Sequence, residues 1–170
     1  MSTLSQFTGS GWDLIDTVEV TTATAQVALL SQIDDTFNNY VVVSTNTLSS
    51  PSAFIGCVLT TGGGTNITAN YGSLAVWPGQ TGSSSICNGS TANIAQYQGS
   101  FVAYFMNLRR STPFKSISTQ STGYDGSSFY LRNFNNALID SSLIDGIKFF
   151  TSGGAFNTGS EFTIYGLRGS

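Results

Sequence analysis

The feature that most constrains this chain is an alternation of apolar and polar side chains with a period of two. The segment DTVEVTTATAQVALL, residues 16–30, shows it clearly, because Val18, Val20, Val27 and Leu29 are separated by polar or small residues. This period is typical of a β-strand with one buried face. Similar runs recur along the chain between clusters of Gly, Ser, Thr and Asn: NNYVVVSTN, AFIGCVLT, SFVAYFMNL, FKSIST, SSFYLRNF, GIKFF and EFTIYGL.

Helical signals are few. Only FNNALIDSSLIDG, residues 134–146, offers a pattern for a short helical turn. Regular strands with at most one or two short helical turns predict an all-β fold, an antiparallel sandwich or barrel. The length of 170 residues and the even composition favour one domain over residues 13–170. Two interpretations stay open for residues 1–12: an N-terminal arm that clasps a neighbouring subunit, or a frayed terminus.

The surface must be built largely from uncharged polar side chains. Charged residues make up only 9% of the chain, against roughly 25% in an average domain. The six Lys and Arg residues are scattered, so no basic stripe predicts nucleic-acid binding. No apolar run reaches the roughly 18 residues of a membrane span, and the N-terminal residues lack the pattern of a secretory signal. We therefore expect synthesis in a cytoplasm and no nucleic-acid or membrane partner.

The residue types that most enzyme chemistry needs are missing or unpaired. The chain has no His to act as base for a Ser or Cys nucleophile. Asp34, Asp35 and Asp125 lie in turn-like segments, where turn capping is the leading interpretation and paired-acid catalysis or calcium binding the alternatives. Two cysteines without His argue against zinc, and we expect Cys57 and Cys87 to be reduced. The sequence therefore predicts a non-enzyme without catalytic residue, cofactor or metal.

Several aromatic residues lie in polar, loop-like settings, where a ring can be exposed. Such rings can stack on the apolar face of a sugar, or they can pack in the core or at a subunit interface. Both interpretations stay open. The candidate interface or glycan-contact residues are Trp12, Tyr71, Trp77, Tyr97, Tyr124 and Tyr165.

Two segments resemble small structural proteins of tailed bacteriophages. In those proteins a closing segment reads as an Ile-x-Phe strand, a Ser-Gly-Asn loop and a strand ending in Ile or Leu, Tyr and Gly, and residues 143–167 are similar to it. Residues 33–46 resemble their Ile-Asp-x-x-aromatic-x-x-Tyr entry into a strand. The matched residues are Ile33, Asp34, Phe37, Tyr40, Ile147, Phe149, Ser152, Gly153, Gly154, Gly159, Ile164, Tyr165 and Gly166. CVLTTGGGTN lacks the arginine-bearing strand and acidic Gly turn that the family often has, and the 79–91 loop is particular to this chain.

The resemblance implies a jelly-roll-like β-sandwich in a virion. Its first implied role is a capsid decoration, or cement, protein that binds the major capsid protein on the outer capsid surface, as a homotrimer or homodimer. The alternatives are a tail-fibre or receptor-binding module that recognises a host surface glycan, and a carbohydrate-binding domain. A single sandwich without a fibrous stem favours the capsid.

The last strand-like runs give a specific prediction for pairing. We expect residues 147–150 and 162–167 to pair as an antiparallel hairpin that closes the sandwich. Alternation along the strands then places Phe149, Phe162 and Ile164 in the core. It places Lys148, Glu161 and Thr163 outward, and it sets Tyr165 against a neighbouring loop or subunit.

Overall fold

The computed structural model describes residues 11–50, 53–69, 71–76, 85–89, 92–96, 98–112 and 114–167. This part of the chain contains thirteen strands and no helix, so the prediction of an all-β fold is confirmed. The segment considered for a helical turn instead contains the end of strand β11 (Phe129–Ile139) and the non-helical connection of residues 140–145. No helix in the described part is long and apolar enough to span a membrane. Residues 1–10, which fall in the N-terminal region left open above, lie outside the described residues.

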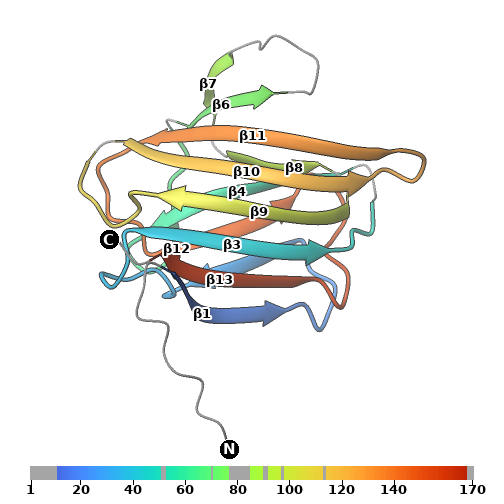
Figure 1. The fold of residues 1–170 in the computed structure, drawn as a ribbon, viewed down its shortest axis with the longest axis horizontal. Coiled ribbons are helices and arrows are strands. Elements are labelled where there is room, and N and C mark those ends of the chain that lie inside the picture. The colour runs from blue at the N-terminus through green and yellow to red at the C-terminus, as the bar shows by residue number, and fades with distance from the viewer. Residues whose placement is uncertain are drawn as a thin grey trace, which may run out of the picture.

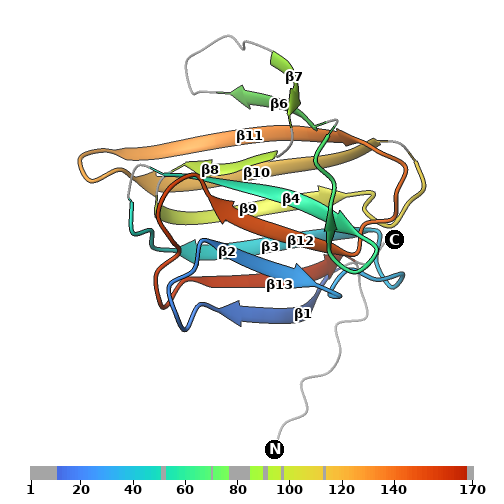
Figure 2. The same ribbon diagram turned by 180° about the vertical axis from the view of Figure 1, so that it is seen from behind.

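The strands form two antiparallel sheets that lie face to face (Figures 1 and 2). The large sheet has eight strands in the order β1 (Trp12–Glu19), β13 (Glu161–Leu167), β3 (Asn39–Asn46), β9 (Gln98–Met106), β10 (Phe114–Tyr124), β11, β6 (Tyr71–Val76) and β7 (Ser85–Gly89). The small sheet has five strands: β2 (Gln26–Leu30), β12 (Gly146–Thr151), β4 (Phe54–Thr61), β5 (Thr65–Asn66) and β8 (Ala92–Gln96), which pairs with β4.

The order of the strands is that of a jelly roll. The set β1-β13-β3-β9 faces the set β2-β12-β4-β8, which is the arrangement of two Greek keys wrapped around each other. The β10–β11 hairpin, with 11 residues in each strand, widens the large sheet, and β6 and β7 extend it further. The predicted jelly-roll-like antiparallel sandwich is therefore present.

Aromatic rings from both sheets meet at the centre of the sandwich. Phe149 of the small sheet lies 5.5 Å from Phe101 and 5.2 Å from Phe162, measured between ring centroids. Phe156, from the connection between β12 and β13, stands perpendicular to Phe162 at 5.1 Å. All four rings are buried. Because these rings belong to different sheets, their contacts hold the two layers together.

The predicted terminal hairpin is wrong, because its two strands lie in different sheets. β12 pairs with β2 and β4, whereas β13 pairs with β1 and β3. The connection between them is no simple polar turn, since Phe156 is fully buried and forms β-bridges with Thr24 and Leu48. This anchored residue carries the chain from one layer to the other. The closing segments therefore face each other across the core instead of sharing hydrogen bonds.

The predicted faces of these strands are nevertheless right. Phe149, Phe162 and Ile164 are fully buried, and Glu161 is exposed. Thr163 points outward as predicted but is only 8% exposed. Its hydroxyl lies 3.1 Å from that of Thr17 on the neighbouring strand, so the adjacent side chains cover it.

Candidate functional site

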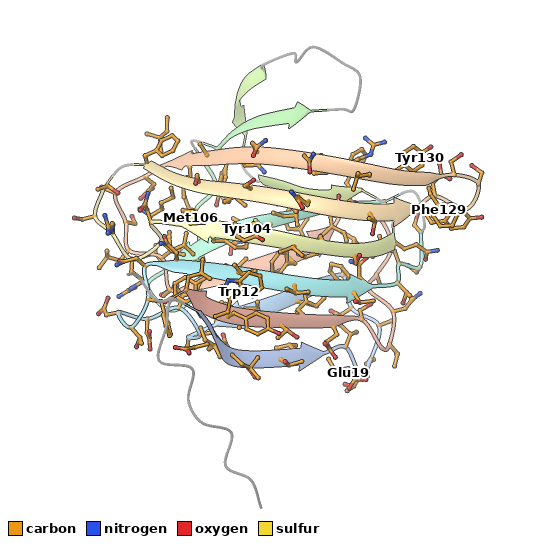
Figure 3. All side chains as sticks on the ribbon, in the orientation of Figure 1. Trp12, Glu19, Tyr104, Met106, Phe129 and Tyr130 are labelled. Carbon is orange, nitrogen blue, oxygen red and sulfur yellow. The ribbon has the colours of Figure 1, made fainter. Side chains whose placement is uncertain are left out.

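The outward-pointing positions of β1, β13, β3, β9, β10 and β11 form one broad surface, which we call the outer face (Figure 3). Alternate residues of these strands belong to the core, so the others point away from it. The outward positions are the odd-numbered residues 39–45 of β3, the even-numbered 98–106 of β9, the even-numbered 114–124 of β10 and the odd-numbered 129–139 of β11. None of these positions carries a charged side chain.

The charges of the β10–β11 hairpin are turned inward. Lys115 and Arg132 are the only charged residues of these two strands, and they are 0% and 6% exposed. The Lys115 Nζ donates to the backbone carbonyl of Asp140 at 2.8 Å and to those of Arg110 and Thr112 at 3.2 Å. Burial lowers the pKa of this ammonium, while the nearby Asp140 carboxylate opposes that shift. The hairpin thus keeps its cations out of the outer face.

An aromatic cluster covers the part of the outer face near β1. Tyr165, Val41 and Tyr104 lie side by side in register on β13, β3 and β9. The Trp12 ring reaches over from the sheet edge to lie 5.6 Å from the Tyr165 ring and 6.3 Å from the Tyr104 ring, centroid to centroid. Val41 is therefore fully buried although it points away from the core, while Trp12 itself is 49% exposed. We call Trp12, Val41, Tyr104 and Tyr165 the Trp12 cluster.

Tyr124 lies at the opposite end of the sheet, at the tip of the β10–β11 hairpin. Its ring is 4.8 Å from that of Phe129, which is 87% exposed. The tip is held by Asp125, whose Oδ1 accepts hydrogen bonds from the backbone N–H groups of Ser127 and Ser128, both at 2.8 Å. These bonds, with one from the Tyr130 hydroxyl, lower the pKa of the Asp125 carboxyl. The geometry is that of a turn cap, as predicted.

The six aromatic candidates therefore do not form one site. Trp12 and Tyr165 come together on the outer face, and Tyr124 lies far from them along the sheet. Tyr71 packs in the core, the second of the two interpretations: it is 1% exposed, and its hydroxyl accepts a 2.8 Å hydrogen bond from the Leu59 N–H. Trp77 and Tyr97 lie outside the described residues.

The candidate set missed Tyr104 and the exposed Phe129. The run SFVAYFMNL is apolar on both faces, so its alternation is hidden in the composition. Counting from the buried Phe101, Ala103 and Phe105 would have placed Tyr104 on the outer face.

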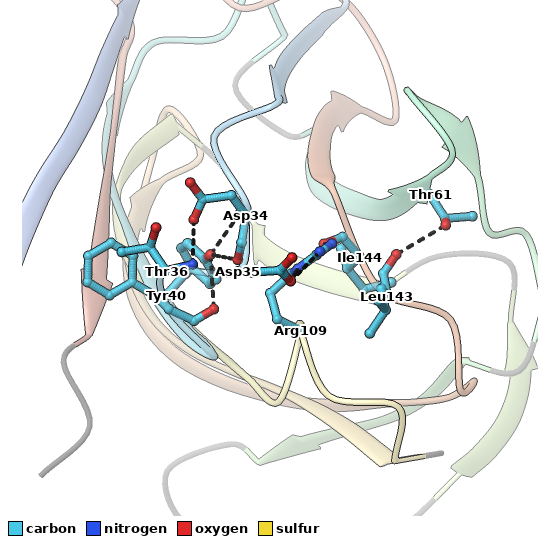
Figure 4. A network of polar contacts seen from close by, with 9 residues as sticks. Asp34, Asp35, Thr36, Tyr40, Thr61, Arg109, Leu143 and Ile144 are labelled. Atoms are coloured by element: carbon cyan, nitrogen blue, oxygen red, sulfur yellow. Dashed lines mark hydrogen bonds and ion pairs between the residues drawn. The ribbon is translucent and has the colours of Figure 1, made fainter.

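The adjacent carboxylates Asp34 and Asp35 serve structure at one corner of the sandwich (Figure 4). Asp34 accepts a 2.9 Å hydrogen bond from the backbone N–H two residues further on, and its carbonyl accepts one from the Tyr40 hydroxyl, also at 2.9 Å. Asp35 pairs with Arg109, whose Nε donates to it at 3.0 Å. Among the described residues, no group of three or more His, Cys, Asp or Glu residues is placed to hold a metal ion.

Cys57 is a free, fully buried thiol in the small sheet, as the prediction of reduced cysteines requires. Burial raises the pKa of this thiol, so it is held in its protonated, unreactive form. The side chain of Cys87 lies outside the described residues.

Comparison with known proteins does not identify the role of the outer face. No model of a known protein family matches this chain, and no curated protein matches it. The likeness to phage structural proteins rests on the two segments described above.

Proposed function

We propose that this protein is a non-enzymatic structural component of a bacteriophage virion. In this proposal it is a capsid decoration protein that binds the major capsid protein on the outer capsid surface and bridges neighbouring capsomers. The observation that carries the proposal is the outer face, a broad sheet surface suited to assembly between protein subunits, whose positions on β3, β9, β10 and β11 carry no charge and which bears an exposed aromatic cluster.

The composition of this face suits binding to another protein. The centres of protein interfaces are depleted of charged residues and enriched in Trp, Tyr and Met, and here Trp12, Tyr104, Met106 and Tyr165 lie on one side of the sheet. Burying a charge without a partner is costly, whereas the Ser, Thr, Asn and Gln side chains of this face need only hydrogen-bond partners. Removing this part of the face from water therefore costs little free energy.

The fold agrees with the resemblance on which the virion assignment rests. The two segments similar to phage proteins contribute β3, β12 and β13, which lie within the jelly-roll core of the molecule. Single jelly rolls occur in viral capsid proteins, although a fold by itself does not determine function. The assignment to the capsid therefore needs a direct measurement.

The test is the copy number of the protein in purified virions of the phage that encodes it, measured by quantitative mass spectrometry against the major capsid protein. A decoration protein repeats with the capsid lattice, so hundreds of copies per particle are expected. A few or a few tens of copies would overturn the capsid role in favour of the tail, and none would overturn the virion role altogether.

Capsids that lack the protein provide a second measurement. If it bridges capsomers, such capsids should release their DNA at a lower temperature, and added purified protein should restore the original temperature. Particles that are equally heat-resistant with and without the protein would contradict the bridging mechanism.

A further inference from the structure

We propose that the outer face of the large sheet binds the same face of a second copy of this chain. The two sandwiches would stack sheet on sheet around a two-fold axis. This inference deepens the proposed function and rests on it for one consequence only: with the outer face covered by the second copy, the dimer would bind the capsid through its remaining surface. A two-fold dimer presents two identical copies of that surface, as bridging of capsomers requires.

Most of the exposed large apolar side chains gather on the outer face. Of the nine large apolar residues that are exposed in the described part of the chain, six lie on the outer face. Register places Trp12 and Leu14 on it, beside Leu167 and Tyr165. The other four lie on the β10–β11 hairpin: Phe114, Phe129, Leu131 and Ile139. So strong a concentration on one side of a sandwich marks an interaction surface.

The middle strands of the outer face also lack charged outward side chains. In a two-fold interface both subunits use the same surface, so a charged residue near the axis meets a charge of its own sign. The outward positions of β3, β9, β10 and β11 avoid this, since they hold no charged side chain, and the outward Glu19 and Glu161 lie together on β1 and β13 at the edge of the face. The outside of the small sheet differs, because Lys148 lies there and donates to the carbonyl of Gly64 at 2.7 Å.

The outer face also has the size of a protein interface. Six strands from β1 to β11, spaced by about 4.8 Å, give a width of about 29 Å, and eight residues of about 3.3 Å give a length of about 26 Å. The face thus covers about 750 Å², close to the roughly 800 Å² that each partner contributes to a standard protein interface.

Two other ways of covering this region fit the structure less well. Pairing between the β1 edges of two copies would bring together Asp13, Asp16 and Glu19 of each chain, and a bulge between Leu14 and Asp16 interrupts that strand. A glycan would need open, parallel rings to stack on. The Trp12 ring is instead inclined by 51° to Tyr165 and by 78° to Tyr104, so the rings pack against each other.

The test is the mass of the purified full-length protein in sedimentation experiments over a range of concentrations. We expect a dimer of twice 17.9 kDa. Gln120→Arg places a charge on an exposed outward residue of β10, next to Val102 near the middle of the face. It should weaken dimerisation by at least about 100-fold, because like charges across an interface are strongly unfavourable. Thr68→Arg introduces the same charge at an exposed residue after β5 and should leave the dimer intact.

Because Gln120 is exposed, the variant should keep the thermal stability of the wild type, and its circular dichroism checks that it is folded. A wild type that stays monomeric at several hundred micromolar would overturn the inference, as would a Gln120→Arg variant that dimerises normally. A monomer that binds a glycan array through Trp12, with loss in Trp12→Ser, would assign the face to sugar instead. Virions that carry hundreds of copies of a monomeric protein would leave the capsid role standing, and a dimer absent from virions would leave the interface standing.

Discussion

Replacing Phe149 by alanine tests whether the aromatic centre of the sandwich holds the two sheets together. Phe149 is fully buried and lies 5.2–6.4 Å from three other rings, those of Phe101, Phe105 and Phe162. These three neighbours belong to the large sheet, whereas Phe149 belongs to the small one. The substitution therefore removes the small sheet's contribution to the cluster.

The expected loss of stability follows from burial. Phe→Ala changes in protein cores cost about 3–5 kcal/mol, the larger values where the cavity cannot collapse. Here the surrounding rings are fixed on strands that are hydrogen-bonded on both sides. We therefore expect a loss of about 4 kcal/mol, a large share of the roughly 5–15 kcal/mol that stabilises a typical domain. For a chain of this size the loss corresponds to a fall of roughly 8–16 °C in Tm.

Urea denaturation measures this loss, and Phe129→Ala is the matched control. It makes the same chemical change at a residue that is 87% exposed, so it should cost no more than about 1 kcal/mol for the lost contact with Tyr124. Both variants should unfold with the slope of the wild type. The reasoning is refuted if Phe149→Ala costs less than 1 kcal/mol (about the control's expected loss) or if the two variants lose the same stability.

Three further predictions concern single positions. A Cβ at Gly146 would lie 2.7–2.9 Å from three atoms of neighbouring strands, so Gly146→Ala should lower the unfolding free energy by about 1–3 kcal/mol, while Gly153→Ala, with open space around it, should not. In a Cys87→Ser background, Cys57 should react with a thiol reagent only after denaturation, and fast labelling of the native protein would contradict its burial. The folded state lowers the pKa of Asp125, so its ionised carboxyl stabilises the fold fully above about pH 4 and progressively less below it. The difference in unfolding free energy between wild type and Asp125→Asn, measured by denaturation, should therefore become smaller as the pH falls. A difference that grows in acid would contradict the lowered pKa.

The sequence predicts the faces of the strands better than their partners. Alternation places Phe149 and Ile164 in the core because side chains on successive residues point to opposite sides. It carries no information on which strand lies beside β12 or β13, since pairing is decided by contacts between distant parts of the chain. The buried Phe156, within a loop of small polar residues, is the local sign that the segment crosses between layers.

The candidate aromatic residues show a second limit. Polar neighbours suggest exposure, yet Tyr71 is buried because its hydroxyl finds a backbone N–H inside the sandwich. Lys115 is a second polar residue that is buried against expectation. The apolar residue before it, Phe114, is exposed, while the Lys115 ammonium is buried against three carbonyls. In both, a hydrogen bond supplied by the tertiary structure compensates the cost of burying a polar group, and composition along the chain cannot reveal it.

The position of β13 between β1 and β3 also determines when the large sheet can be completed during synthesis. Among the described strands, β1 pairs with β13 alone, and the paired residues Thr17 and Thr163 are 146 positions apart. Of these strands, β1 is made first, so it waits without a described partner until β13 has left the ribosome, while β3 also has one open side. Sheets built from such distant pairs fold slowly, in milliseconds to seconds, and their unpaired strands are exposed to aggregation meanwhile. Uncharged strands such as β3 and β9 have no electrostatic protection during that interval, so overproduction of the protein should demand chaperones or slow translation.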